Sequence, residues 1–251
     1  MYLLHLMLMH QQCVAKSPPP VTANLLLDLR PTISRLWQDA AMTTPVTADG
    51  DPVGALLDGS PNAYVFRQTT GADRPTYKTD GTREWLLSSG SRHLVCMASD
   101  LTTVVPINIT SDMTIYQAFE RASAGILSMG LGGVPITTEN PLFWYDVDNK
   151  IYYGLPSAQV TSAADTSTGN VTMTTRRLST GPRATLRKNG AQIHDSTAGA
   201  GALSGSLRYL LRVSGSHHSG KWYGSVAYSA GHADASVELS AMETYMASLM
   251  P

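Results

Sequence analysis

The stretch RATLRKNGAQI, residues 183–193, carries the strongest hairpin signal in the chain. Its central pair, Asn189-Gly190, predicts a type I′ turn, because both central residues of that turn need a positive φ, which Asn and Gly adopt readily. Upstream, LFWYDVDNKIYYG at residues 142–154 predicts a second hairpin, with aromatic arms on either side of Asp148-Asn149-Lys150. These hairpins indicate a chain built mainly of antiparallel β-sheet.

Further short apolar runs predict strands on both sides of the hairpins. They are residues 24–30, 85–87, 93–97, 113–121, 171–177 and 220–228. A helix is the alternative for Met113–Arg121, because residues 117–122 are good helix formers, but we expect a strand there. One helix is predicted from about Asp234 to Met250, with one apolar face. That face carries Val237, Met242, Tyr245 and Leu249. Many strands and one terminal helix indicate a sandwich.

Composition narrows the function classes. The 251 residues include 18 Lys and Arg against 19 Asp and Glu, for a formal net charge of −1, and only 15% are charged. The chain has 26 Thr and 25 Ser instead, a composition typical of short strands and turns. Because nucleic-acid binding needs a positive surface, we expect no nucleic-acid partner. Arg176-Arg177 and residues 183–188 form one basic cluster, which we expect at a solvated strand edge.

The first residues differ from the rest. MYLLHLMLMH is apolar but too short to span a membrane. Pro18-Pro19-Pro20 form a stiff spacer, which predicts a boundary between an arm at residues 1–20 and one domain at residues 21–251. We expect the arm to serve attachment or oligomerisation. Cys13 and Cys96 are expected to be free thiols, with a single bridge between them as the alternative.

Four segments, in chain order, resemble a known family. They are LWQDAAMTTPVTADGDPVGALLDGSPN, QTTGADRPTYKTDG, RATLRKNGAQI and GKWYGSVAYSAGHADASVELSAMETYMA. Together they resemble the concanavalin A-like lectin/glucanase superfamily in its laminin-G-like form, as in phage and prophage virion proteins. The resemblance implies an all-β fold, a two-sheet antiparallel jelly-roll sandwich with one C-terminal helix. It implies that Leu25–Leu29 pairs with Val226–Tyr228, and that sugars bind on a concave sheet face or its rim loops.

Glucanases of this superfamily hold two carboxylates close together on one strand, roughly 5 Å apart. The five glutamates, Glu84, Glu120, Glu139, Glu238 and Glu243, do not form the corresponding Glu-x-Asp-x-x-Glu pattern. Only Asp146 and Asp148 stand two residues apart on an apolar run, which would place both on one side of a strand. We interpret these two as turn formers at a hairpin end. The sequence therefore predicts no enzyme activity.

Sugar sites combine aromatic faces with polar groups that form hydrogen bonds. The candidate contacts are Trp144, Tyr145, Tyr152, Tyr153, His217 and His218. Because neighbouring residues of an extended chain point to opposite sides, one of the two histidines is expected at the sheet and the other in solvent. Trp37 and Trp85 are expected in the core.

Lectins of this superfamily often hold Ca²⁺ through loop oxygens, and the chain has two such stretches. Asp58 lies in one, and Asp146, Asp148 and Asn149 lie in the other. Their oxygens are the hard ligands that Ca²⁺ prefers. Asx turns are the alternative for both stretches. No cofactor other than Ca²⁺ is expected.

The resemblance and the missing catalytic motif together predict a non-enzymatic structural protein of a tailed-phage virion. Its lectin-like domain is expected to bind surface glycans, to contact other virion proteins through residues 1–20, and to form a homo-oligomer. One alternative is a carbohydrate-active enzyme with an atypical site at Asp146 and Asp148. The other is an architectural module without a ligand, since this fold hosts all three kinds of protein.

Overall fold

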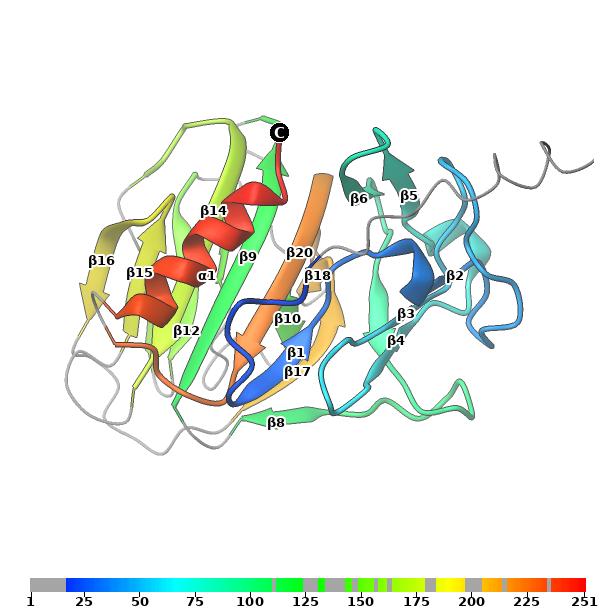
Figure 1. The fold of residues 1–251 in the computed structure, drawn as a ribbon, viewed down its shortest axis with the longest axis horizontal. Coiled ribbons are helices and arrows are strands. Elements are labelled where there is room, and N and C mark those ends of the chain that lie inside the picture. Colours follow the sequence, from blue (N-terminus) through cyan, green and yellow to red (C-terminus); the bar gives the residue numbers. More distant parts are fainter. Residues whose placement is uncertain are drawn as a thin grey trace, which may run out of the picture.

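A computed structural model of the chain describes residues 17–109, 112–123, 131–133, 143–145, 149–155, 158–161, 164–178, 184–196, 205–213, 216–233 and 236–251. Two antiparallel sheets face one another, and one helix lies on the outer side of the larger sheet (Figure 1). The predicted fold class, an all-β sandwich with one C-terminal helix, is confirmed.

The larger sheet has eight strands. Its order is β16 (Ala191–Ser196), β15 (Ala184–Lys188), β14 (Gly169–Arg177), β9 (Met113–Arg121), β20 (Gly220–Tyr228), β6 (Glu84–Ser88) and β5 (Thr76–Thr79), and β1 (Leu25–Asp28) also pairs with β20. Leu25 lies opposite Tyr228 and Leu27 opposite Ala227, so the predicted pairing of the first strand with the last is confirmed.

The second sheet has seven strands. Its order is β10 (Leu131–Gly133), β17 (Gly205–Leu210), β7 (Leu94–Cys96), β4 (Val65–Arg67), β3 (Ala55–Leu57) and β2 (Leu36–Trp37), and β8 (Ile107–Ile109) pairs with β17. Smaller units are β11 (Phe143–Tyr145), β12 (Ile151–Leu155) and β13 (Ala158–Thr161), the pair β18 (Arg212–Val213) and β19 (Ser216–His217), the short 3₁₀ turns at Ile33–Arg35 and Gly71–Asp73, and the helix α1 (Val237–Ser248).

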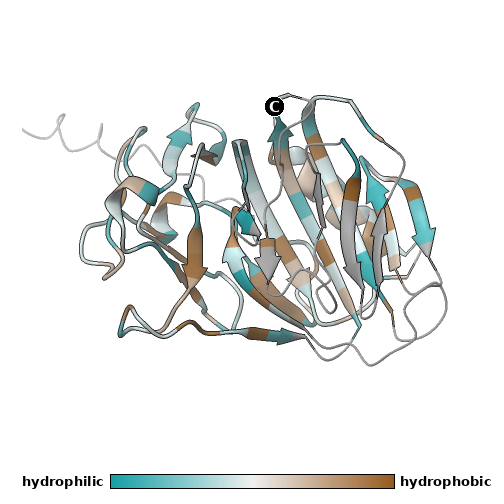
Figure 2. Cartoon of the chain, turned by 180° about the vertical axis from the view of Figure 1, so that it is seen from behind, coloured by the Kyte–Doolittle hydropathy of each residue, from teal (hydrophilic) through white to brown (hydrophobic). Residues whose placement is uncertain are grey.

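The core has two layers because the larger sheet is covered on both faces. Phe66, Leu86, Phe119 and Trp222 are among the buried side chains between the sheets. Tyr116, Tyr223, Tyr228, Leu239 and Met242 are among those between the larger sheet and α1. Hydrophobic and hydrophilic bands alternate along several strands, as the two-residue period of a strand requires (Figure 2). Each large apolar side chain buried in this way contributes about 1.5–3 kcal/mol.

Two local predictions are confirmed by the backbone. Met113–Arg121 is a strand, and the helix alternative is wrong because successive side chains pack into opposite layers of the core: Ile115 lies between the sheets and Tyr116 lies in the layer with α1. Asn189 and Gly190 have φ values of 49° and 79° at the turn between β15 and β16, which is the positive-φ turn expected there.

The helix prediction needs a correction. The side chain of Val237 is 81% exposed, and the residues of α1 buried against the sheet are Leu239, Met242 and Met246. Val237 is the first residue of the helix, which Ser236 caps by accepting a hydrogen bond from the Leu239 N–H. The apolar face therefore starts at Leu239, two residues later than predicted, and the predicted Met242, Tyr245 and Leu249 do pack on this layer.

The basic cluster is also placed differently from the prediction. Arg176 and Arg177 are only 2% exposed, so they do not lie at a solvated edge. The Arg176 guanidinium donates to the His232 carbonyl at 2.6 Å and to the Thr185 hydroxyl at 3.1 Å. The loop that leads to α1 reaches Arg176 through His232, whereas Arg177, the next residue of β14, points to the opposite side of the sheet.

Trp37 and Trp85 were expected in the core, but both are only half-buried. Trp222 and Tyr223 are both fully buried, one in each layer of the core. Cys96 is a buried free thiol, and burial raises its pKa to about 12. No helix among the described residues has the length and hydropathy needed to cross a membrane.

Candidate functional site

Four side chains meet where the second sheet passes into the β18–β19 hairpin. His93 precedes β7, Tyr209 lies in β17, Arg212 in β18 and His217 in β19. We refer to these four residues as the histidine cluster. Strand pairing assembles it, because Tyr209 lies opposite Val95 of β7 and Arg212 lies opposite His217.

A strained backbone position separates Tyr209 from Arg212. Leu211 has a φ of +67°, a value that is unusual for a residue with a branched side chain. Its carbonyl accepts a hydrogen bond from the His218 N–H at 2.9 Å, which closes the hairpin around this bend. Such strain persists only where the surrounding structure holds it, and it commonly marks functional positions.

The rings of the histidine cluster pack closely. The centroid of His93 lies 5.1 Å from that of His217 and 6.5 Å from that of Tyr209. The Arg212 guanidinium lies 5.1 Å from the centroid of the Tyr209 ring. Nη1 of Arg212 is 3.1 Å from Nε2 of His93, and Nδ1 of His93 is 2.7 Å from the Ser91 carbonyl oxygen. Because a carbonyl only accepts, Nδ1 carries the proton and Nε2 accepts from Arg212.

Arg212 carries the charge of the histidine cluster, because the two histidines are neutral. Burial lowers the pKa of His93, and the nearby Arg212 charge lowers it further. Burial also lowers the pKa of His217, with smaller contributions from His93 and Arg212. Asp73 opposes these shifts weakly, and its carboxylate already accepts from the Ser91 hydroxyl. Both imidazoles are therefore neutral near pH 7.

Arg212 has unused hydrogen-bonding capacity. Its Nε atom is buried without a hydrogen-bond partner, and no carboxylate among the described residues forms an ion pair with it. A buried guanidinium group normally has a partner for each donor. An oxyanion reaching this side chain would find a cation backed by an aromatic ring, with polar imidazole nitrogens on its flank.

The predicted contacts His217 and His218 do not form one site. His218 is fully buried, its ring lies 6.1 Å from that of Phe119, and its Nε2 is 3.3 Å from the Lys221 carbonyl oxygen. His217 is only partly buried and lies in the histidine cluster. His218 lies at the sheet as expected, whereas His217 packs against His93 rather than standing in solvent.

The aromatic hairpin forms as predicted in its backbone. Phe143 pairs with Tyr153, Trp144 with Tyr152, and Tyr145 with Ile151. The side chains of the four predicted aromatic contacts, Trp144, Tyr145, Tyr152 and Tyr153, lie outside what the structure describes. Their role in sugar binding stays a prediction.

Two of the predicted calcium ligands are used for internal hydrogen bonds. The buried Asp58 carboxylate accepts from the Asp28 N–H at 2.7 Å, and from the N–H and hydroxyl of Ser60 at 2.9 and 2.5 Å. Oδ1 of Asn149 accepts from Arg121 at 2.7 Å. Oxygens that already face these donors do not fit a cation site. Asp146 and Asp148 lie outside the described residues, within which no group of His, Cys, Asp and Glu side chains could hold a metal.

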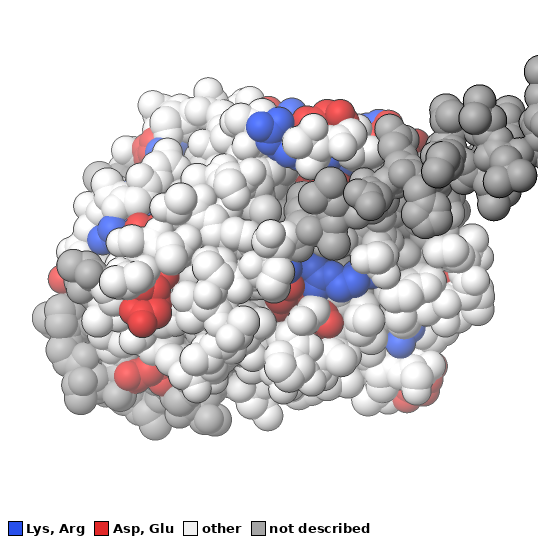
Figure 3. Space-filling model, viewed as in Figure 1, with Lys and Arg blue, Asp and Glu red and all other residues white. Residues whose placement is uncertain are grey.

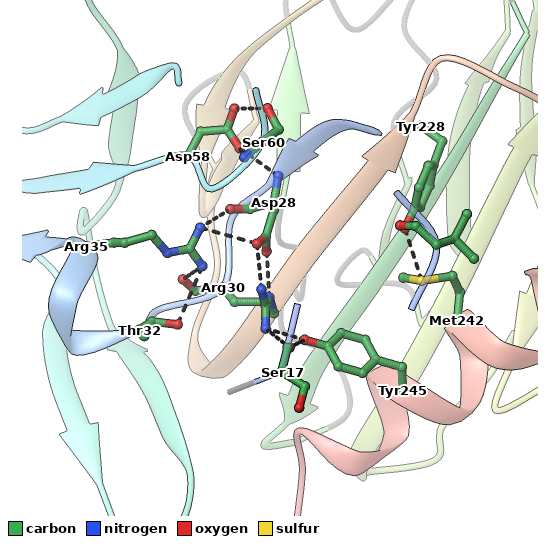
Figure 4. A network of polar contacts seen from close by, with 11 residues as sticks. Ser17, Asp28, Arg30, Thr32, Arg35, Asp58, Ser60, Tyr228, Met242 and Tyr245 are labelled. Atoms are coloured by element: carbon green, nitrogen blue, oxygen red, sulfur yellow. Dashed lines mark hydrogen bonds and ion pairs between the residues drawn. The ribbon is translucent and has the colours of Figure 1, made fainter. Parts of the chain in front are cut away.

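A polar network around Asp28 joins β1 to the helix (Figure 4). Asp28 forms ion pairs with Arg30 at 2.6 Å and Arg35 at 3.3 Å. Burial opposes the Asp28 charge, but the hydrogen bond from Arg30 and the charges of both arginines lower its pKa. Arg30 also donates to Tyr245 of α1 and, at 2.8 Å, to the Ser17 carbonyl oxygen. This network is buried and internally paired, so we assign it a structural role.

The glutamates give no catalytic pair among the residues that the structure describes. Glu84 accepts from the Ile33 N–H and the Tyr77 hydroxyl, both at 2.9 Å. Glu120 forms an ion pair with Lys221 at 3.0 Å, and Glu243 forms one with Arg187 at 2.7 Å. On the face shown in Figure 3, basic side chains lie mostly beside acidic ones.

Sequence reasoning found His217 but missed the rest of the cluster. His93 was seen only as the first residue of an expected strand, and Tyr209 and Arg212 were not considered. Their link to His217 depends on pairings between distant strands, and one sequence carries no signal for those. The closest hint was the Tyr-Leu-Leu-Arg run just before the two histidines.

Comparisons with known proteins support the fold. No family model matches the sequence, and no curated protein sequence matches it. The structure is similar to the binding domain of botulinum neurotoxin DC in complex with SialylT, with a TM-score of 0.57, 9% identity, and coverage of 92% of this chain and 52% of that chain. It is also similar to Trypanosoma rangeli sialidase, with a TM-score of 0.54, 9% identity, and coverage of 92% and 34%.

A second structure of the Trypanosoma rangeli sialidase, in complex with sialic acid, gives a TM-score of 0.53 at 10% identity, covering 93% of this chain and 35% of that chain. The chain thus spans about half of the toxin chain and about a third of the sialidase chain. At these identities the likeness shows a β-sandwich fold and nothing further. The relation to concanavalin A-like phage proteins stays a prediction.

Proposed function

We propose that this chain is a non-enzymatic, lectin-like module that binds a glycan bearing a carboxylate, at the histidine cluster. The observation that carries the proposal is Arg212, a cation that lies over Tyr209 and has no carboxylate partner among the described residues. A guanidinium binds a carboxylate through two parallel hydrogen bonds, and an aromatic ring offers a flat surface to a sugar. Solved proteins of similar fold whose names include sialic acid or SialylT support this choice of ligand.

Binding of 3′-sialyllactose and of lactose by the full chain tests the proposal. We expect 3′-sialyllactose to bind and Arg212→Gln to weaken its binding by about tenfold or more, because a charge-assisted pair is lost. Arg208→Gln is the matched control, since Arg208 lies in the neighbouring strand and donates to the Ser206 hydroxyl at 3.1 Å. Equal affinity of Arg212→Gln and wild type would refute the assignment of the site.

The non-enzymatic part of the proposal has its own test. The described glutamates have internal partners or, like Glu238, lie in the first turn of α1, so we expect no release of sialic acid from 3′-sialyllactose. If wild type releases sialic acid and the double variant Asp146→Asn, Asp148→Asn does not, the result would instead favour a carbohydrate-active enzyme. Absence of binding to any glycan on an array would favour an architectural module.

The proposal includes display on a tailed-phage virion as a homo-oligomer, with residues 1–20 as the attachment arm. Its support is the resemblance of the four sequence segments to virion proteins. The Ser17 carbonyl accepts from Arg30 and, at 2.8 Å, from the Tyr245 hydroxyl, so the arm contacts the domain at Ser17. Deletion of residues 1–16 retains these contacts. That variant is expected to fold and bind glycan but to be missing from particles; normal incorporation would contradict the attachment role.

A further inference from the structure

The helix covers only part of the outer face of the larger sheet. α1 packs across β9 and β14, whereas β6 and β5 lie on the far side of β20 (Figure 1). Trp85, Glu120, Lys221 and Tyr223 come together in the region between them. We refer to these four residues as the tryptophan platform.

The side chains of the platform lie within contact range of one another. The Trp85 ring centroid is 6.1 Å from that of Tyr223, and the Lys221 Nζ atom is 5.7 Å from the Trp85 centroid. Lys221 Nζ is 3.0 Å from a carboxylate oxygen of Glu120, and the two side chains are 37% and 28% exposed. Trp85 is half-buried. An aromatic ring is thus bordered by one cation and one anion that solvent can reach.

A bulge in β20 sets the position of Tyr223. The register with β9 shifts between Trp222, which lies opposite Phe119, and Gly224, which lies opposite Ala118. Tyr223 is the extra residue of this bulge and packs in the outer layer. Gly224 has a φ of +153°, and a Cβ atom there would lie 3.0 Å from Cγ of Arg30, so glycine suits the bend. Bulges commonly re-aim a side chain next to a functional site.

The Tyr223 hydroxyl is the unexplained group of the platform. It is buried and has no hydrogen-bond partner within the part of the chain that the structure describes. Burial, with smaller contributions from Glu120 and Asp80 and against the opposing charge of Arg83, raises the pKa of Tyr223 to about 12, so the hydroxyl keeps its proton. A buried hydroxyl without a partner is costly, and each one in a folded protein calls for an explanation.

The charges around the platform are balanced. Lys221 pairs with Glu120 at 3.0 Å, Arg83 with Asp80 at 3.5 Å, and Lys78 with Asp49 at 2.5 Å. Lys78 lies opposite Trp85 in the sheet. An anionic ligand would find no unpaired cation here, in contrast to Arg212. A neutral polyol would find acceptors and donors close to an aromatic face.

The geometry points to a binding subsite for a neutral pyranose ring, which stacks on Trp85 and exchanges hydrogen bonds with Glu120 and Lys221, while the buried Tyr223 supports the Trp85 ring from within the outer layer. The ligand class follows from the balanced charge and from the flat apolar ring beside polar groups. The inference shares with the proposed function only the idea that the chain binds glycans. It uses different residues and needs no carboxylate on the ligand.

Titration of the full chain with lactose, maltose and N-acetyllactosamine tests the subsite. We expect at least one of them to change the intrinsic tryptophan fluorescence, and calorimetry to give its affinity. Trp85→Ala should weaken that affinity by about tenfold or more. Trp37→Phe is the control, because Trp37 is also half-buried and lies in β2 of the second sheet.

Glu120→Gln and Lys221→Met keep the test decisive if Trp85→Ala fails to fold, because both side chains are partly exposed. Each removes one polar group with little change of shape, and each is expected to weaken binding of the neutral sugar while leaving the melting temperature near that of wild type. Absence of binding by all three sugars, or unchanged affinity in both variants, would overturn the subsite.

The outcomes also separate the two sites. If 3′-sialyllactose binding depends on Arg212 and no neutral sugar binds, the proposed function stands and the tryptophan platform fails. If a neutral sugar binds through Trp85 and 3′-sialyllactose shows no dependence on Arg212, the platform stands and the proposed acidic-sugar site fails.

Discussion

The ring centroids of His93 and His217 lie 5.1 Å apart, although His93 directly precedes β7 and His217 lies far along the chain in β19. Burial keeps both imidazoles neutral, and His93 already uses its two ring nitrogens with Ser91 and Arg212, so His217 is the imidazole that we expect a ligand at Arg212 to meet. The proposed site depends on this arrangement, in which neutral rings surround a single cation.

His217→Gln is expected to weaken binding of 3′-sialyllactose by about tenfold, because a partly exposed ring and its hydrogen bonds are lost from the site. His194→Gln is the matched control, since His194 is a partly exposed histidine of β16 in the other sheet. Titration calorimetry measures the affinity of both variants for 3′-sialyllactose. Equal affinities for the two would remove His217 from the site.

His218 predicts a loss of stability in acid. Burial lowers its pKa to about 4, well below the usual value of about 6.5. The folded state therefore binds this proton less readily than the unfolded state. The free energy of unfolding should fall by about 1.4 kcal/mol per pH unit as the pH drops from about 6.5 to about 4.

The measurement is urea unfolding across this pH range, with His218→Leu for comparison. The variant lacks the titrating ring, so its free energy of unfolding should depend less steeply on pH. The slope of the variant should be smaller than that of wild type by about 1.4 kcal/mol per pH unit. If the free energy of unfolding changes equally with pH in the variant and in wild type, His218 does not cause the loss of stability in acid.

Asp28→Asn should be strongly destabilising. The substitution leaves Arg30, which is 4% exposed, without its main counter-charge, and breaking a buried ion pair costs about 3–5 kcal/mol. Asp49→Asn is the control, because its ion pair with Lys78 is exposed and should add nothing measurable. Thermal unfolding compares the two. A melting temperature of Asp28→Asn equal to that of the control would contradict a structural role for the network.

Gly190→Ala tests the hairpin that defines the fold class. A φ of 79° disfavours any residue with a Cβ atom, so a loss of about 1–2 kcal/mol is expected. Gly71→Ala is the control, since Gly71 has open space around it and does not have a positive φ. Chemical unfolding gives the difference in the free energy of unfolding between the two variants. Equal values would contradict a positive φ at Gly190.

Local features of the fold were predictable from the sequence. The strand at Met113–Arg121 and the turn at Asn189-Gly190 are determined by side-chain types within a few residues, and both are confirmed. Burial of Arg176 and exposure of Val237 were not predicted, because each depends on where the segment after β20 crosses the sheet. Neither short-range pattern nor composition specifies that crossing.

The candidate site was less predictable than the fold. His217 could be proposed from its chemistry, but its neighbours His93 and Arg212 are brought to it by strand pairing. The tryptophan platform depends on a β-bulge at Tyr223, which places this residue in the outer layer. Gly224 is the one residue there whose type hints at a bulge, and a single glycine is too weak a signal to predict it. The balance of charges around the platform could not be predicted either. The Lys221–Glu120 and Lys78–Asp49 ion pairs each join residues that are far apart in the sequence.

The central claim is that Arg212 binds the carboxylate of a glycan, and a double-mutant cycle in which the ligand is one partner tests it most directly. Affinities of wild type and Arg212→Gln are measured by calorimetry for 3′-sialyllactose and for its methyl ester, which lacks the charge. We predict that esterification weakens binding to wild type by about tenfold or more and changes binding to Arg212→Gln little. Equal losses on esterification in both proteins would show that the carboxylate does not meet Arg212, and would contradict the account.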